Sequence, residues 1–196
     1  MSSPSHTNQT KILFILSSAN RTLTGEPTGW YLPEAAHPYY ELVSQYNITF
    51  AAPLGPNPPL DPKSVELFKE DAESVKFLND ESSKANSLLP LTAWHKGKII
   101  SAVCHGPAAL VSAETRHILT KNSILKGNVW SNENHPISTE DRIKDLGGLY
   151  EKAEKPWDAH VVVDGNLITG QNPASARPLA QAIAQELAKR VKAVPA

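Results

Sequence analysis

The chain has 196 residues, with 19 Lys and Arg against 20 Asp and Glu, a formal net charge of −1 and a single Cys. This length can bury a core, so we expect a single domain over residues 1–196. The balanced charge gives no reason to expect a nucleic-acid partner, and one Cys excludes an internal disulfide and fits a reducing compartment.

The N-terminal segment 1–10 is polar and lacks an apolar signal region, and no apolar run is long enough to cross a bilayer. We expect this segment to be disordered. We also expect a protein of the cytoplasm, with presence in the nucleus left open, and no membrane partner.

Two apolar runs, 11–17 and 47–52, are typical of buried strands. Between them we predict a helix that begins near Pro33 and is disturbed by Pro38. Glu34 falls in the first turn of that helix. It is either a solvated acid that complements the helix dipole or a carboxylate aimed into a cleft above the sheet.

After a proline-rich loop, we expect Asp61 or Ser64 to cap a helix that runs to about Leu78. A further helix is predicted over 84–95. Two helices therefore follow each other where an alternating chain would place a strand between them. The alternation resumes with a strand over 98–103.

The strongest chemical signal lies where this strand ends, at Cys104. Its neighbours two places away, Ala102 and Gly106, are both small, and Pro107 suits the first turn of a following helix. This is the spacing of a nucleophile elbow. The N–H groups and dipole at a helix start favour the thiolate, and His105 beside it is a base. The alternative is a buried structural cysteine.

Strands that are apolar on both faces and alternate with helices predict an α/β fold. We expect a flavodoxin-like, three-layer α/β/α sandwich with a mainly parallel sheet, and a site at the carboxyl ends of its strands, where Cys104 lies. The remaining predicted elements are a strand over 123–130, a helix over 139–146 capped by Thr139, a hairpin of strands 160–164 and 166–169 around Asp164–Gly165, and a last helix over 174–191 that Pro173 opens and Asn172 caps.

Three motifs stand in order along the chain: GWYLPEAAHP at 29–38, AVCHGPAAL at 102–110, and a segment over 147–175 that contains YEKA, PW and TGQNPAS. Together they resemble the ThiJ/PfpI family of the class I glutamine amidotransferase-like superfamily, in its chaperone and glyoxalase III branch. The resemblance implies a flavodoxin-like sandwich, a homodimer, and a glutathione-independent glyoxalase that needs no cofactor. Chaperone and deglycase roles are also implied for relatives.

The resemblance implies that Cys104 is the nucleophile, that His105 is the histidine beside it, and that Glu34 is the glutamate that hydrogen-bonds the thiol. A third, acidic member would come from the loop after the next strand. Glu133 is the carboxylate in that loop, and His135 is the alternative at the expected position.

The chain departs from the family pattern at two places. A strand and a Gly-Gly-His-Gly-type loop, which supply N–H groups to the oxyanion, are missing before the elbow, and a second shortening falls between Asn134 and Thr139. We therefore expect a sheet shortened by one central strand and loop, which leaves backbone groups of the neighbouring strands unpaired. Loss of an oxyanion donor lowers a rate by about 100-fold or more.

Three functions follow as hypotheses. The first is a cysteine-dependent lyase that converts methylglyoxal, a small 2-oxoaldehyde, to D-lactate through a Cys104 hemithioacetal and protects against reactive carbonyls. The second is a catalytically impaired stress chaperone. The third is an amidotransferase-like hydrolase, although such enzymes keep their histidine far downstream of the cysteine. The histidines at 37, 117 and 160 do not share a ligand spacing, so no metal is expected.

Overall fold

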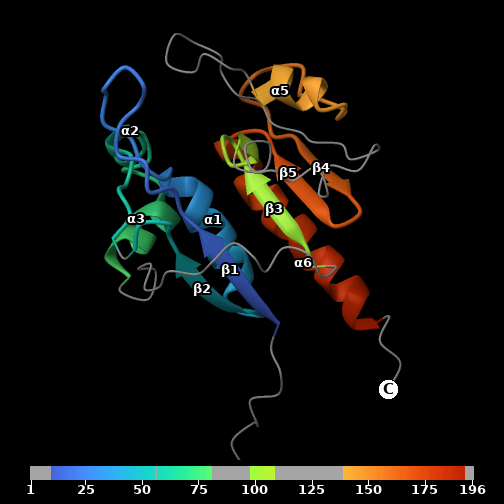
Figure 1. Cartoon of the computed structure of the whole chain (residues 1–196). Coiled ribbons are helices and arrows are strands. Elements are labelled where there is room, and N and C mark those ends of the chain that lie inside the picture. The colour runs from blue at the N-terminus through green and yellow to red at the C-terminus, as the bar shows by residue number, and fades with distance from the viewer. Residues whose placement is uncertain (1–9, 56, 81–97, 109–138, 193–196) are drawn as a thin grey trace, which may run out of the picture. The chain divides into compact units, whose positions relative to one another are not determined.

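The computed structural model consists of helices and strands (Figure 1). Among the described residues, buried apolar side chains form separate hydrophobic clusters. The chain divides into an N-terminal unit, made of Met1–Asn20 and Thr28–Leu89, and a C-terminal unit, made of Arg21–Pro27 and Pro90–Ala196. Among the described helices, none combines the length and the apolar composition needed to span a membrane. The residues that the structure describes are 10–55, 57–80, 98–108 and 139–192.

The N-terminal unit is built on two parallel strands, β1 (Lys11–Ile15) and β2 (Asn47–Ala51), as predicted. The connection between them includes helix α1 (Leu32–Leu42), since parallel strands need a crossover. Aromatic side chains fill the space between this sheet and its helices, and their rings meet edge to face. The buried core of this unit is Leu32, Ala35, Ala36, Tyr39, Phe50 and Phe77.

Pro38, predicted to disturb this helix, lies inside α1 without ending it. A proline in a helix interior removes one backbone hydrogen bond and costs about 3 kcal/mol. Here the proline is buried on the core side of the helix, and that burial offsets part of the cost.

The helical segment after β2 is two helices rather than the single one predicted to run to about Leu78. The side chain of Asp61 accepts the N–H of Ser64, and that of Asp71 accepts the N–H of Ser74. Because Asp71 satisfies the first turn of a new helix, the chain restarts there. Asp61 is therefore the cap, and Ser64 is instead a buried link that accepts the N–H of Leu32. The two helices are α2 (Pro62–Leu67) and α3 (Ala72–Asn79).

The C-terminal unit contains a three-stranded sheet between two helices, and its strand order is β3-β5-β4. Leu167 and Ile168 are consecutive in β5 and point to opposite faces, one toward a cluster with Ile143 and the other toward a cluster with Leu179. Side chains of α5 and α6 thus pack on opposite faces of β5, as expected for the predicted sandwich. The elements are β3 (Ile100–Val103), α5 (Thr139–Asp145), β4 (Val161–Asp164), β5 (Leu167–Gly170), η3 (Pro173–Ser175) and α6 (Ala176–Lys192).

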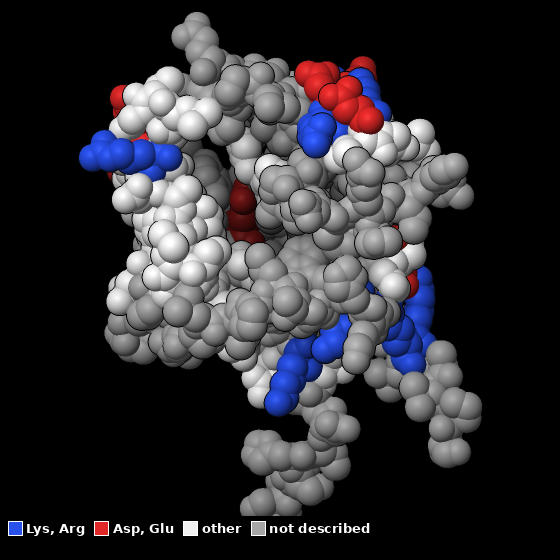
Figure 2. Space-filling model, viewed as in Figure 1, with Lys and Arg blue, Asp and Glu red and all other residues white. Residues whose placement is uncertain are grey.

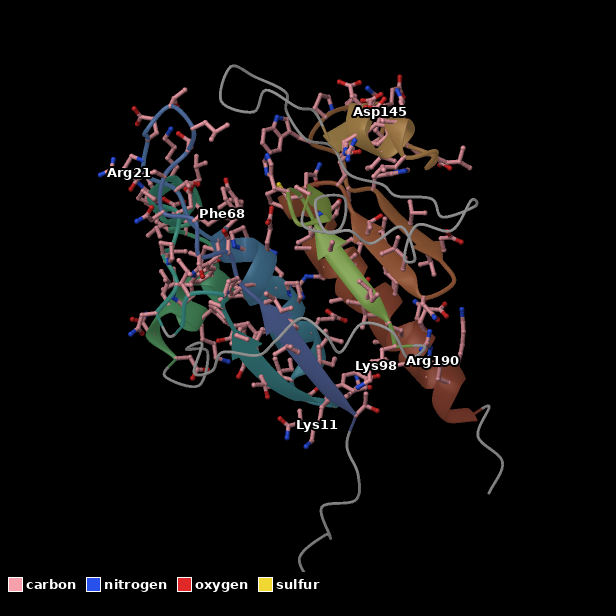
Figure 3. The ribbon with its side chains drawn as sticks, in the orientation of Figure 1. Lys11, Arg21, Phe68, Lys98, Asp145 and Arg190 are labelled. Carbon is pink, nitrogen blue, oxygen red and sulfur yellow. The ribbon has the colours of Figure 1, made fainter. Side chains whose placement is uncertain are left out.

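The predicted hairpin is confirmed: β4 and β5 pair antiparallel, with Asp164 opposite Leu167. Gly165 has a φ of 56°, which a two-residue hairpin turn requires. Arg190 donates to the side-chain oxygen of Asn166 and so ties the end of α6 to this turn (Figure 3).

Within the described residues, β1 and β3 each have a strand partner on one side only. The same holds for β2 and β4, so the pairing does not test the predicted loss of a central strand, which stays a prediction. The helix predicted over 84–95 and the strand predicted over 123–130 lie outside the described residues.

Candidate active site

Cys104 follows directly after β3 in a backbone conformation that is rare for a side chain of its kind. Its φ is 53°, in the left-handed region, which costs about 1–2 kcal/mol for a residue with a Cβ. Two hydrogen bonds hold the turn: the N–H of Cys104 donates to the carbonyl of Gly170 at 2.9 Å, and the N–H of Gly106 donates to the carbonyl of Val103 at 2.8 Å. A strained residue held in this way at the end of a strand is typical of a functional site.

The thiol of Cys104 lies beside the imidazole of His105. The distance from Sγ to Nδ1 of His105 is 3.2 Å, and the thiol is partly exposed while His105 is exposed. An imidazole at this distance can take up or return the thiol proton. The pair therefore has the geometry of a nucleophile with an adjacent base, accessible to a small molecule.

Position 106, two residues after Cys104, must hold a small residue for steric reasons. A Cβ at this position would lie 2.9 Å from the carbonyl oxygen of Val103, 3.1 Å from its nitrogen and 3.3 Å from the Cβ of Ala102. These contacts are mostly with backbone, which cannot move aside. Pro107 follows as the buried first residue of a helical turn, as predicted.

The junction between β5 and α6 supports the turn from the neighbouring strand. Val103 lies opposite Gly170 in the parallel register, so the two strands end together. Asn172 caps η3, as predicted for the start of the last helix, and shares a capping box with Ser175. Gln171 is fully buried there and bonds the backbone of residues 153 and 156. Sequence reasoning gave Gln171 no role, because its partners are backbone groups far upstream in the sequence.

The remaining predicted site residues are Glu34, Glu133 and His135. Glu34 lies half-buried in the first turn of α1, in the N-terminal unit, where its N–H donates to the carbonyl of Tyr31 at 3.1 Å. Its relation to the thiol stays a prediction. Glu133 and His135 lie outside the described residues. The structure thus brings together Cys104 and His105.

Among the described residues, no group of three or more His, Cys, Asp or Glu side chains could hold a metal ion. Helix α5 carries both acidic and basic side chains, and its Glu140 pairs with Lys144 of the same helix and with Lys152 beyond it. Figure 2 shows acidic and basic side chains side by side there rather than a surface of one sign.

Residues 81–186 match the model of the DJ-1/PfpI family. Glyoxalase 3 of Candida albicans is 25% identical over 221 positions, which take in 85% of this chain and 93% of that protein. Glutathione-independent glyoxalase HSP31 of Saccharomyces cerevisiae is 32% identical over 101 residues, 44% of this chain and 43% of that protein. The crystal structure of Rapid Encystment Protein 24 kDa of Francisella tularensis has a TM-score of 0.76 at 26% identity and covers 91% of this chain and 99% of its own.

The alignment with the Candida protein also shows that this chain is shorter than that relative over the aligned region. Because 85% of this chain is about 167 residues, roughly 54 of the 221 aligned positions have no counterpart here. This comparison gives the size of the difference and not its place, so the predicted loss of a central strand and loop stays a prediction.

Proposed function

Because this chain belongs to the DJ-1/PfpI family, we propose that it is a glutathione-independent glyoxalase that converts methylglyoxal to D-lactate. The observation that carries the proposal is the strained Cys104 with the imidazole of His105 3.2 Å from its sulfur. The names of the relatives from Candida and Saccharomyces support the reaction class. The protein's own thiol would take the place of glutathione.

The chemistry starts with addition of the Cys104 thiolate to the aldehyde carbon, which forms a C–S bond and, after protonation of the oxygen, a hemithioacetal. A base then removes the hydrogen of that carbon as a proton, and the electron pair moves to form an enediol. Return of a proton to the neighbouring carbon gives a thioester of the 2-hydroxy acid. Water cleaves the thioester and releases lactate and the thiol. The net reaction is therefore methylglyoxal plus water giving lactate.

His105 is the proposed base, because its Nδ1 is within reach of the sulfur and therefore of the carbon bonded to it. Glu34 is proposed to hydrogen-bond the thiol or the substrate oxygen, and Glu133, or His135 at the same position, to complete the site. The proposed assembly is a homodimer, and the proposed compartment is the cytoplasm.

The test is consumption of methylglyoxal without glutathione, with the lactate enantiomer identified by a D-specific dehydrogenase. Cys104→Ser and His105→Gln are expected to abolish or strongly reduce turnover, while Lys69→Gln, at an exposed position on the other unit, keeps it. In D2O, the enediol route places deuterium on C2 of the lactate. Turnover by Cys104→Ser, or L-lactate as the product, would contradict the proposal.

A second candidate is a chaperone of the same family without this chemistry, and the roughly 54 unmatched positions favour it. It predicts that the chain suppresses aggregation of a heated client protein and that Cys104→Ser does so equally well. Failure to suppress aggregation at any ratio of chaperone to client removes this candidate.

A further inference from the structure

The turn that carries Cys104 is attached to a buried polar cluster, which we call the Gln-Asn-Ser clamp and define as Gln171, Asn172 and Ser175. Their exposed fractions are 0%, 4% and 0%. The carbonyl that receives the N–H of Cys104 belongs to Gly170, the residue directly before the clamp. The clamp is therefore one peptide unit from the hydrogen bond that holds the strained φ of the nucleophile.

The side chain of Gln171 uses both ends of its amide. Its Oε1 accepts the N–H of Ala153 at 2.8 Å, and its Nε2 donates to the carbonyl of Pro156 at 2.9 Å. Its backbone N–H donates to the carbonyl of His160 at 3.0 Å. A buried amide with donor and acceptor both satisfied fixes the groups around it, because leaving either unpaired costs about 1–3 kcal/mol.

Asn172 and Ser175 form hydrogen bonds to the same upstream segment of the backbone. Nδ2 of Asn172 donates to the carbonyls of Pro156 and Asp158 at 2.9 and 2.8 Å. The hydroxyl of Ser175 accepts the N–H of His160 at 3.0 Å. Segment 153–160 is thus tied at four residues to the carboxyl end of β5.

Packing joins the clamp to the turn as well. A Cβ on Gly170 would lie 3.0 Å from the Cβ of Ser175 and 3.4 Å from Cγ2 of Val103. Side chains of both the clamp and β3 thus lie close to the α-carbon of Gly170. Backbone at this point is fixed from the clamp on one side and from β3 on the other.

We propose that the Gln-Asn-Ser clamp positions the Cys104 turn, so that Gln171, Asn172 and Ser175 set the reactivity of the thiol without touching the substrate. The proposal rests on the proposed role of Cys104 as nucleophile. Its test measures alkylation of the thiol, which needs no glyoxalase activity. Loss of the glyoxalase proposal would therefore leave this test intact.

The variants remove clamp bonds while keeping shape. Asn172→Asp keeps the oxygen that caps η3 and loses the donor to residues 156 and 158. Gln171→Glu keeps the acceptor for Ala153 and loses the donor to Pro156. Ile183→Ala is the matched control, because it removes a buried side chain of α6 that packs on Ile168 and lowers stability by about 2–5 kcal/mol.

The measurement is the rate of iodoacetamide alkylation against pH, with folding checked by circular dichroism. As the sole cysteine, Cys104 is the only thiol that can react. Both clamp variants are expected to react at least about threefold more slowly at pH 7, with a higher midpoint or lower plateau, whereas Ile183→Ala keeps the profile of the unaltered protein. Wild-type profiles in the clamp variants, or an equal change in Ile183→Ala, would overturn the proposal. If the acidic variants fail to fold, Ser175→Ala is compared with Ile183→Ala in the same way.

Discussion

The sulfur of Cys104 and Nδ1 of His105 lie 3.2 Å apart, and the backbone that brings these consecutive side chains together has a φ of 53° at the cysteine. A residue with a Cβ costs about 1–2 kcal/mol in this region, whereas glycine adopts it readily. The cysteine is thus maintained at a position that glycine would occupy with less strain.

This strain predicts the order of stability of two inactive variants. Cys104→Gly is expected to unfold at a higher urea concentration than Cys104→Ala and to be more stable by about 1 kcal/mol, because only alanine retains the Cβ. Equilibrium urea unfolding followed by tryptophan fluorescence measures the difference. An alanine variant as stable as the glycine variant would mean that the turn is not strained.

The next prediction concerns the small flank of the nucleophile. Gly106→Ala places a Cβ 2.9 Å from the carbonyl oxygen of Val103, so we expect a loss of about 1–3 kcal/mol and slower alkylation of Cys104. Gly165→Asn is the control, because nothing lies within 4 Å of its Cβ and asparagine tolerates a positive φ. Equal losses in the two variants would contradict the steric explanation.

Sequence reasoning found the elements whose signals are local. The apolar runs at β1, β2 and β3 predicted strands, and the Asp164–Gly165 turn predicted the hairpin, because a two-residue loop fixes its own geometry. The turn after β3 was also predictable, since small residues flank the cysteine and a proline suited to the first turn of a helix follows within six positions.

Features that depend on distant partners were not predicted. The single helix expected up to about Leu78 divides at Asp71, whose carboxylate also meets His37 of α1, 34 positions away. The role of Gln171 depends on backbone groups 15 and 18 positions upstream. Such pairings are set by the packing of whole elements, which no local pattern in the sequence reports.

Asp71 links α3 to α1, and its titration gives a prediction for acid stability. Burial alone would raise the pKa of Asp71, but hydrogen bonds from Ser74 and His37 together lower it below its ordinary value. A lowered carboxyl pKa contributes stability that is present above the unfolded value, about 4, and is lost as the pH falls through the folded value.

Asp71→Asn keeps an oxygen for the cap and loses the charge. At pH 7 we expect it to be less stable than the unaltered chain by up to about 1 kcal/mol, and this gap should close below about pH 4, where Asp71 becomes protonated. Urea unfolding at pH 7, 5 and 3 measures the gap. Glu66→Gln, which breaks an exposed pair with Lys69, is the control and should show no such closing. A gap that stays constant with pH would refute the role of the Asp71 charge.

For Tyr150 we predict a change in stability at alkaline pH, because its pKa is shifted upward rather than downward. Its ring packs against Ile143 and Leu167, while the Nζ atoms of Lys144 and Lys152 lie 5.7 and 5.9 Å from the ring centre. Its hydroxyl is buried and meets no hydrogen-bond partner among the described residues. Burial, with a contribution from Glu140, raises the pKa of Tyr150 to about 12.

Tyr150→Phe removes an unsatisfied hydroxyl and keeps the ring, so at pH 7 we expect a gain of about 1 kcal/mol in the free energy of unfolding. Tyr150→Leu, which loses the ring and its contacts with the two lysines, should instead be less stable. A raised tyrosine pKa contributes stability that is present below about pH 10 and lost as the pH rises toward 12. The advantage of phenylalanine over tyrosine should therefore widen between these values in urea titrations. A phenylalanine variant less stable than the parent at pH 7 would show that the hydroxyl of Tyr150 has a partner.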